Sequence, residues 1–418
     1  MDHVKGLKCV LCGREYTTEE TLYTCPTCGV KGILDVVYDY DLVGRRLTVE
    51  KLAQNPERSM WRYIDLLPIA QRELIPPLQV AWTPLYHVTR LGQSLGLNEL
   101  YIKDDGRNPT ASFKDRASAV AVIKARELGF DTITCASTGN AASSLAGLAA
   151  SVALPTVIFV PERAPAAKVA QLLIFGAQVL LVKGTYDQAF DLCLEVSAEY
   201  GWYSRNTAIN PYLSEGKKTA SLEICEQLDW QVPDKIFVSV GDGCIIGGLW
   251  KGLRDLRALG FIDRFPQLIG VQAEGSAPLV KTWREGTEEI EPIIPHTIAD
   301  SISVGIPRDG IKALRAARES KGAYVAVSDE AILEAMRILG RDAAVFAEPA
   351  GATGFAGLLK MLREGQVQPD ERVVVLVTGN GLKDTETAIK AAGKPHTIEP
   401  TIEAVRAFVS QQKGMNGH

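Results

Sequence analysis

The chain reads Asn108-Pro109-Thr110-Ala111-Ser112-Phe113-Lys114-Asp115-Arg116 at the point that decides its interpretation. One lysine follows a turn there, among small and aromatic residues, where a helical pattern begins. A lysine amine has a pKa of about 10.4 and is protonated at neutral pH. Partial burial beside apolar groups lowers that pKa and lets the amine attack a carbonyl. Taken alone, the stretch fits either a Schiff-base lysine or an ordinary helix start with Lys114 in solvent.

The composition describes a globular chain of more than one domain. Of its 418 residues, 46% are apolar and 23% charged, as in proteins with a substantial core. The net charge of −5 gives no indication of a basic surface that would bind nucleic acid. The longest apolar stretches, 153–160 and 179–182, are far short of the roughly 20 residues of a membrane span. Because no apolar signal-peptide segment is visible, we expect a cytoplasmic protein.

Short apolar runs alternate with helical patterns through most of the chain. Continuous apolar runs are typical of buried parallel strands, and their alternation with helices predicts open parallel sheets with helices on both faces. The predicted strands are 100–103, 132–135, 156–160, 178–182, 235–240, 268–272 and 373–377. The predicted helices are 114–128, 141–151, 166–175, 186–200, 215–228, 245–259, 329–339, 353–363 and 383–392.

The first 40 residues predict a small unit of their own, because four of the eight cysteines lie there. They form two C-x-x-C pairs, each followed by a glycine that allows a tight turn. Four thiolates can bind one tetrahedral zinc ion, and they leave no open position for catalysis. A structural zinc ribbon is therefore favoured over a metal-free vestige. The predicted ligands are Cys9, Cys12, Cys25 and Cys28.

Two loops that follow predicted strands have the composition of anion sites, and ligands bind at the carboxyl ends of parallel strands. Ser137-Thr138-Gly139-Asn140-Ala141-Ala142-Ser143 offers hydroxyls, an amide and backbone N–H groups at a helix start, which attracts carboxylates and phosphates. Simple N-capping by Ser137 or Thr138 explains one residue but not the cluster.

The second loop is Gly241-Asp242-Gly243-Cys244-Ile245-Ile246-Gly247-Gly248. Its spacing fits neither a dinucleotide fingerprint nor a P-loop. Glycines that let the backbone approach a phosphate fit a single-phosphate cradle better, although a structural strand-to-helix turn is the alternative. We expect the carboxylate of Asp242 to point away from a bound dianion.

A third loop, Thr378-Gly379-Asn380-Gly381-Leu382-Lys383-Asp384, places a hydroxyl at the end of a predicted strand. A hydroxyl there can hydrogen-bond a heteroaromatic nitrogen without supplying a full charge. The motif is weak on its own, since Asn-Gly is a common turn.

Reactive lysine, anion loop, phosphate cradle and late hydroxyl, in this order, resemble the pyridoxal phosphate (PLP) enzymes of the tryptophan synthase β-type fold. Within that group the chain is most similar to the threonine synthases, some of which carry a similar cysteine-rich N-terminal segment. The resemblance covers residues 60 to about 392. Its motifs are Trp61-Arg62-Tyr63, Thr83-Pro84-Leu85, Ser112-Phe113-Lys114-Asp115-Arg116, Ser137-Thr138-Gly139-Asn140 and the loop 378–384.

The resemblance implies an α/β fold of type II among PLP enzymes, with two open parallel-sheet domains behind the zinc-ribbon-like segment 1–40. Residues 41–117 and 229–418 would form the large, PLP-binding domain, and residues 118–228 the small one. A homodimer is expected. Lys114 would carry PLP as a Schiff base, and Ser137 and Thr138 would contact the substrate. The implied cofactor-binding residues are Phe113, Lys114, Asn140, Gly241, Asp242, Gly243, Cys244, Ile245 and Thr378.

The resemblance also implies the reaction, in which Lys114 moves protons while O-phosphohomoserine and water become threonine and phosphate. One position departs from the pattern. Many threonine synthases have a phosphate-binding arginine where this chain has Leu213. Arg205, Lys217 and Lys218 are the candidates to replace it.

Three other interpretations stay open at this stage. A threonine or serine dehydratase would use the same lysine, and the segment Glu348-Pro349-Ala350-Gly351-Ala352 resembles one in those enzymes. A cysteate synthase-like replacement of the phosphate of phosphoserine is the second. The third, from another class, is a zinc-ribbon binding protein whose enzyme-like body is inactive.

Overall fold

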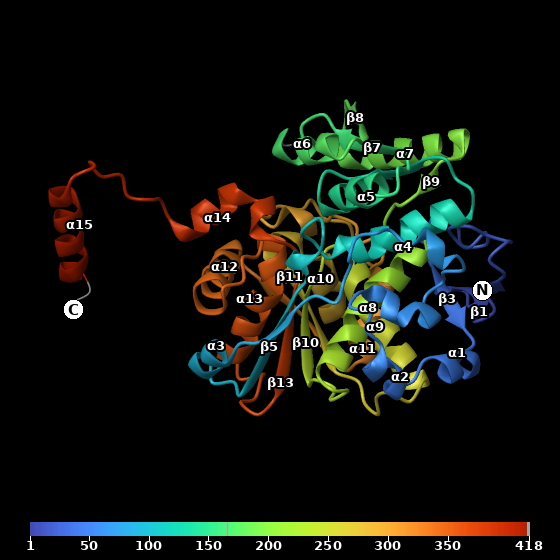
Figure 1. Cartoon of the computed structure of the whole chain (residues 1–418), viewed down its shortest axis with the longest axis horizontal. Coiled ribbons are helices and arrows are strands. Elements are labelled where there is room, and N and C mark those ends of the chain that lie inside the picture. The colour runs from blue at the N-terminus through green and yellow to red at the C-terminus, as the bar shows by residue number, and fades with distance from the viewer. Residues whose placement is uncertain (165, 416–418) are drawn as a thin grey trace.

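The computed structural model describes residues 1–164 and 166–415, which fold around three sheets. A three-stranded antiparallel sheet holds the N-terminus, and sheets of six and four strands form the body (Figure 1). The two larger sheets confirm the predicted α/β fold with two parallel-sheet units. The boundaries of 117/118 and 228/229 between them stay a prediction.

The six-stranded sheet has the order β12-β11-β10-β13-β5-β4. Its neighbouring strands are parallel except β4, which runs antiparallel to β5 at the edge. The central strands are apolar on both faces because helices cover both faces. The bounds are β4 Leu85–His87, β5 Glu99–Asp104, β10 Lys235–Ser239, β11 Gln267–Ala273, β12 Ala323–Val327 and β13 Arg372–Val377.

The four-stranded sheet has the order β8-β7-β6-β9, and all of its pairings are parallel. With α5, α6 and α7 it forms the upper layer in Figure 1. The bounds are β6 Ile133–Ala136, β7 Thr156–Pro161, β8 Gln178–Val182 and β9 Tyr203–Ser204.

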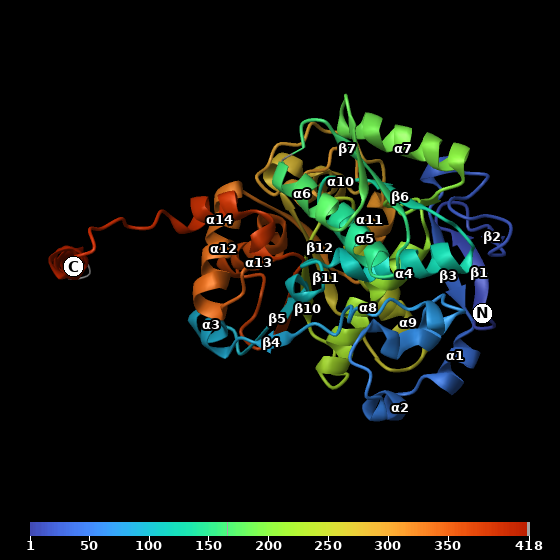
Figure 2. The same ribbon diagram turned by 45° about the horizontal axis from the view of Figure 1, so that its top comes forward.

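Helices connect the strands of both sheets, and α14 and α15 follow the last strand. They are α3 Thr89–Ser94, α4 Lys114–Glu127, α5 Asn140–Ala150, α6 Ala166–Ile174, α7 Tyr186–Tyr200, α8 Tyr212–Gln227, α9 Cys244–Ala258, α10 Pro278–Glu285, α11 Gly310–Glu319, α12 Asp329–Ala343, α13 Pro349–Arg363, α14 Thr385–Ala392 and α15 Ile402–Met415. Within the described part of the chain, none of these helices is long and apolar enough to cross a membrane. Helix α15 stands away from the body at the end of an extended segment in both ribbon views (Figures 1 and 2).

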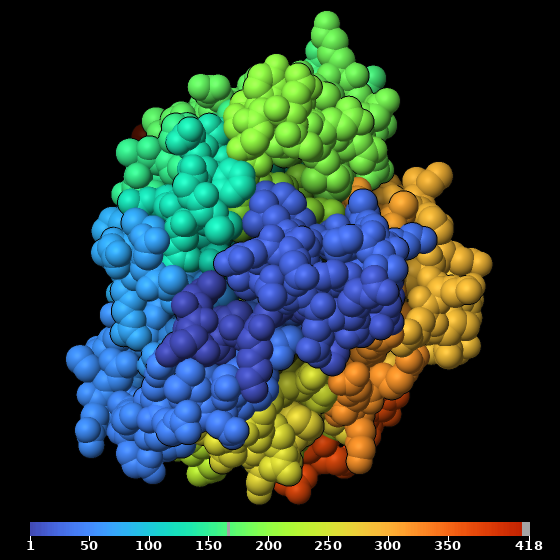
Figure 3. Space-filling view, turned by 90° about the vertical axis from the view of Figure 1, so that its right-hand side faces the viewer, coloured from blue at the N-terminus to red at the C-terminus, as the bar shows by residue number. Residues whose placement is uncertain are grey.

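The N-terminal segment packs on one side of the body (Figure 3). Its strands are β1 Val4–Cys9, β2 Glu15–Tyr16 and β3 Leu34–Tyr38, in the order β2-β1-β3, followed by α1 Tyr40–Arg46 and α2 Val49–Gln54. Two contacts join this segment to α11. Lys312 Nζ lies 2.5 Å from Asp35 Oδ1, and Arg315 Nη1 donates to the carbonyl oxygen of Val10 at 2.6 Å.

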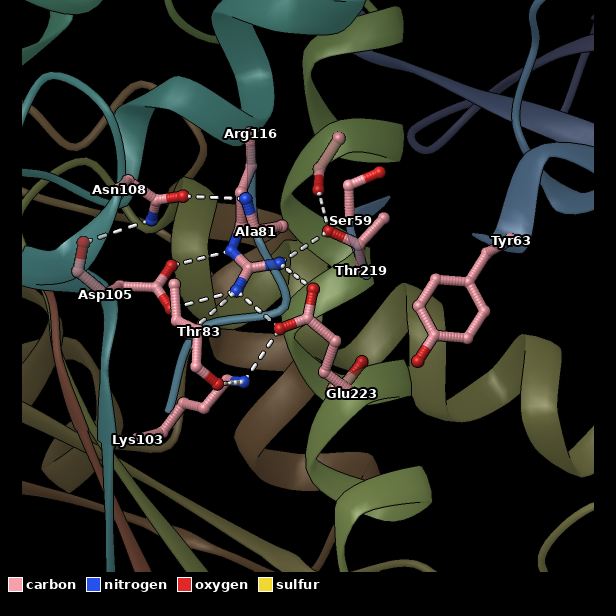
Figure 4. A network of polar contacts seen from close by, with 12 residues as sticks. Ser59, Tyr63, Ala81, Thr83, Lys103, Asp105, Asn108, Arg116, Thr219 and Glu223 are labelled. Carbon is pink, nitrogen blue, oxygen red and sulfur yellow. Dashed lines mark hydrogen bonds and ion pairs between the residues drawn. The ribbon is translucent and has the colours of Figure 1, made fainter. Parts of the chain in front are cut away.

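A buried ion network joins β5, α4 and α8 (Figure 4). Arg116 Nε donates to Asp105 at 2.6 Å, and its Nη1 donates to Glu223 at 2.6 Å. Lys103 Nζ lies 2.7 Å from the other oxygen of Glu223, and Thr83 donates to Asp105 at 2.6 Å. Burial opposes the charge of Glu223, yet Arg116 and Lys103 lower the pKa of its carboxyl to about 2. Every carboxylate of the network therefore has a cationic partner.

The packing of α8 against α4 requires a glycine. A Cβ at Gly216 would lie 2.0 Å from the carbonyl oxygen of Arg116, which no side chain can tolerate. This close approach brings Arg116 within reach of Glu223, although 107 residues separate the two in the chain.

Candidate functional site

The site lies where strands of both body sheets end. The loops that follow β6, β10 and β13 face a common space, as expected at the carboxyl ends of parallel strands. This space comprises a cavity of about 690 Å³ and a smaller one of about 40 Å³. The walls of both cavities include Lys114, Asn140, Thr207, Asp242 and Ser301.

Lys114 is the first residue of α4 and reaches both cavities. The backbone N–H of Phe113 donates to the carbonyl oxygen of Thr378 at 2.9 Å, which fixes the helix start against the end of β13. Burial, and then the nearby charge of Lys217, lowers the pKa of Lys114 to about 8. About a tenth of its amine is then unprotonated at pH 7, and this is the form that attacks a carbonyl.

The loop after β10 has the geometry of a phosphate cradle. Gly243 has φ +91° and precedes α9, and no side chain caps that helix start. A Cβ at Gly241 would lie 2.9 Å from Ile302 Cα, so a side chain there would collide with the opposite wall. Uncapped N–H groups at the start of a long helix suit a phosphate.

Asp242 lines both cavities. Its Oδ1 accepts a hydrogen bond from the backbone N–H of Arg308 at 3.3 Å. Burial raises the pKa of its carboxyl, which favours the neutral form beside an incoming anion.

Asn140 begins α5 and faces a carboxylate that is not among the predicted site residues. Its Nδ2 donates to Glu348 Oε1 at 2.6 Å. Burial raises the pKa of Glu348 to about 7 although the hydrogen bond from Asn140 opposes the shift. The signal for this residue in the sequence is the segment Glu348–Ala352, which resembles one in dehydratases.

The structure brings together the residues predicted for cofactor and substrate. The small cavity is lined by Phe113, Lys114, Asn140, Gly241, Asp242, Gly243, Cys244, Ile245 and Thr378, and the large one by Ser137 and Thr138. The roles of these residues stay predictions. Thr207, Ser301 and Ile302, which also line the small cavity, lie on segments that no predicted element had marked.

The residue at the position of the family's arginine, Leu213, and the candidates to replace that arginine differ in their surroundings. Leu213 is 1% exposed and belongs to the apolar core. Lys218 is paired with Glu215 at 2.5 Å and Asp255 at 2.7 Å. Arg205, by contrast, lines the large cavity.

These features fit pyridoxal phosphate. An uncapped helix start, a glycine loop with no room for side chains and a nearby lysine of lowered pKa provide a phosphate site and an amine in one space. Lys114, Asn140, the loop Gly241–Ile245 and Thr378 are the residues that could hold the cofactor.

The four N-terminal cysteines also come together. Their sulfur atoms all lie within 4.8 Å of one another, and those of Cys12 and Cys25 are 3.8 Å apart. Four thiolates at 2.3 Å from one tetrahedral zinc ion would be about 3.8 Å apart. The cluster could therefore hold a structural zinc ion.

Comparison with known proteins agrees with this geometry. The family model described as "Pyridoxal-phosphate dependent enzyme" matches residues 77–379. A threonine synthase of Methanocaldococcus jannaschii is 41% identical over 406 residues, covering 97% of this chain and 99% of the relative. A threonine synthase of Methanosarcina acetivorans is 42% identical, covering 96% and 98%. The solved structure of threonine deaminase isoform 2 from Solanum lycopersicum, 23% identical, covers 74% of this chain and 87% of its own with a TM-score of 0.63, a likeness of fold.

Proposed function

The chain belongs to the family of pyridoxal-phosphate dependent enzymes and, within it, to the threonine synthases, and on this premise we propose that it acts on O-phosphohomoserine. The overall reaction converts this substrate and water to threonine and phosphate. The observation that carries the proposal is the amine of Lys114 beside an uncapped helix start in one cavity.

The bound cofactor supplies an electron sink for the negative charge that develops at the substrate Cα. Lys114 would move the protons. Its Nζ would take the proton from Cα and then one from Cβ, after which the Cγ–O bond breaks and its electron pair leaves with phosphate. Water then supplies the hydroxyl at Cβ, and protons return to Cα and Cγ.

The remaining residues would bind and orient. The uncapped start of α5 after Ser137 and Thr138 suits the substrate carboxylate. Asn140 would donate to the phenolic oxygen of the cofactor, and its bond to Glu348 fixes the amide. Backbone N–H groups of the loop Gly241–Ile245 would bind the cofactor phosphate, and Thr378 would face its ring nitrogen.

A substrate panel tests this function. Purified holoenzyme is given O-phosphohomoserine, O-phosphoserine, threonine and serine in parallel, and phosphate, ammonia and 2-oxo acids are measured. We expect phosphate and threonine from the first substrate at the highest kcat/KM. Ammonia and a 2-oxo acid from threonine or serine as the main products would indicate a dehydratase instead, and phosphate from O-phosphoserine alone would indicate the β-replacement enzyme.

The resemblance also underlies the proposal of a homodimer, and the proposed biosynthetic reaction underlies that of a cytoplasmic location. Light scattering on the purified holoenzyme tests the first, and a mass of one chain would contradict it. Cell fractionation tests the second.

A further inference from the structure

Three cations surround the site without carboxylate partners. No ion pair formed by the described residues includes Lys114, Arg205 or Lys217, although Arg205 and Lys217 are 1% and 2% exposed. They lie close enough together that Lys217 and Arg205 both lower the pKa of Lys114, after the larger effect of burial. Burying like charges without counter-ions costs stability, so an anion that enters this space gains strong interactions.

Among these cations, Arg205 is the one that is oriented by a side-chain hydrogen bond, has a nitrogen without a partner among the described residues and lines the large cavity. Its Nε donates to Ser118 Oγ at 3.1 Å, which orients the guanidinium. Its Nη2 is buried with no hydrogen-bond partner among the described residues. Ser118 follows Lys114 by one helical turn, so both lie on the same face of α4.

Lys217 and Lys218, the other candidates to replace the arginine, are placed differently. Lys218 already has two carboxylate partners. Among the described residues, those that line the two cavities do not include Lys217. A Cβ at Gly248 would lie 2.7 Å from Lys217 Cβ, so Lys217 runs against the first turns of α9, behind the phosphate cradle.

We propose that Arg205 binds the phosphate group of the substrate and so determines specificity for a phosphorylated amino acid. This inference rests on the proposed function. A guanidinium offers parallel N–H donors that match two phosphate oxygens, and the unsatisfied Nη2 supplies one of them. The same contact stabilises the charge that phosphate gains as the Cγ–O bond breaks.

Phosphate reaches this space from two sources, the substrate and the cofactor, so the test separates them. Holoenzymes of the wild type, Arg205→Met, Arg205→Lys and Ser118→Ala are compared, with Arg254→Met as a control because Arg254 is exposed on α9. Calorimetry measures the binding of inorganic phosphate, and the absorption of the bound cofactor reports the binding of L-threonine, which has no phosphate. Cofactor affinity and its ³¹P signal are measured separately.

Loss of a charged hydrogen-bonding partner predicts that Arg205→Met weakens phosphate binding roughly 10- to 100-fold. KM for O-phosphohomoserine should rise in parallel. Arg205→Lys should lose about tenfold because it keeps the charge without the planar fork, and Ser118→Ala a few-fold. Binding of L-threonine, cofactor affinity and the ³¹P signal should stay at the values of the control.

Unchanged phosphate binding in Arg205→Met, or no phosphate binding by the wild type, would overturn the assignment. So would a fall in cofactor affinity with a shifted ³¹P signal, since Arg205 would then serve the cofactor. If Arg205→Met does not fold, Arg205→Lys and Ser118→Ala carry the same comparison. Failure of the proposed function looks different: the wild type would bind inorganic phosphate but release none from O-phosphohomoserine.

Discussion

Two clusters of charge lie on opposite sides of α4, and they differ in one respect. Around Arg116, each carboxylate has a cation within 2.7 Å. Around Lys114, two residues earlier, Arg205 and Lys217 have no carboxylate partner among the described residues. Residues two apart on a helix face different directions, so one helix serves both clusters.

The difference separates structural charges from functional ones. A fully paired buried network is closed to ligands, and removing one partner leaves an uncompensated charge. An unpaired buried cation has already lost its hydration, so an anion satisfies it at little further cost. The ion network is therefore expected to determine stability, and the unpaired cluster to determine binding and rate.

The largest expected effect is on turnover, through Lys114→Ala. The variant loses both the amine that anchors the cofactor and the group that moves protons, so kcat should fall by about 10⁴-fold or more. Phosphate release from O-phosphohomoserine measures it, with Lys183→Ala, an exposed lysine, as control. A variant with normal kcat would remove Lys114 from the mechanism.

The contrast is sharpest in stability. Arg116→Met leaves Asp105 and Glu223 short of a partner and should lower the free energy of unfolding by about 3–5 kcal/mol. Arg205→Met strands no carboxylate and should change it by less than about 1 kcal/mol. Urea unfolding of the two apoenzymes measures both values. Equal losses would show that the two clusters do not differ in the way described.

A third expectation concerns pH and the apoenzyme. Burial raises the pKa of Glu348 from 4.5 to about 7, so the folded state holds this proton more tightly than the unfolded chain. The stability gained from it is complete below pH 4.5 and is lost as pH rises through 7. The loss is on the order of 3 kcal/mol.

Comparison with Glu348→Gln isolates that contribution. The variant has no proton to lose, so the difference in unfolding free energy between variant and wild type should grow between pH 5 and pH 8. A difference that stays constant with pH would show that Glu348 titrates normally.

The smallest expected effect is on the rate at which apoenzyme takes up cofactor. Because burial and Lys217 lower the pKa of Lys114 to about 8, the unprotonated amine increases about tenfold per pH unit below 8. Rapid mixing with pyridoxal phosphate, followed by absorption, should show a rate that rises with pH and levels off above 8. Lys217→Met should move this midpoint upward, and an unmoved midpoint would show that Lys217 does not lower the pKa of Lys114.

Much of the body could be predicted from sequence because buried parallel strands are continuous apolar runs. The strand predicted at 178–182 coincides with β8, and the helix at 186–200 with α7. β9 has only two residues, and β4 is an exposed antiparallel edge, so neither produced such a run. β12 was also missed, although its sequence Ala323–Val327 is a short apolar run.

The site was predictable where chemistry lies in one loop and not where it depends on pairing. The composition of the loops after β6, β10 and β13 predicted that they bind ligands, and the confirmed family relationship agrees with that prediction. Glu215 lies three residues before Lys218 on the same helix, but the second partner of Lys218, Asp255, lies 37 residues away and could not be found from the sequence. The lack of a carboxylate partner at Arg205 could not be found from the sequence either. Glu348 was missed because only burial gives its carboxyl an unusual pKa.

The contacts of the N-terminal segment with α11 have a practical consequence. A Cβ at Gly243 would lie 2.6 Å from Ala313 of α11, so this helix also supports the phosphate cradle. Asp35 is the ion-pair partner of Lys312 on the same helix. A shortened recombinant form that begins after β3 would lack Asp35 and leave Lys312 without this ion-pair partner beside the cradle. Its yield of cofactor-loaded protein should fall even though residues 77–379, which match the enzyme family, are all retained.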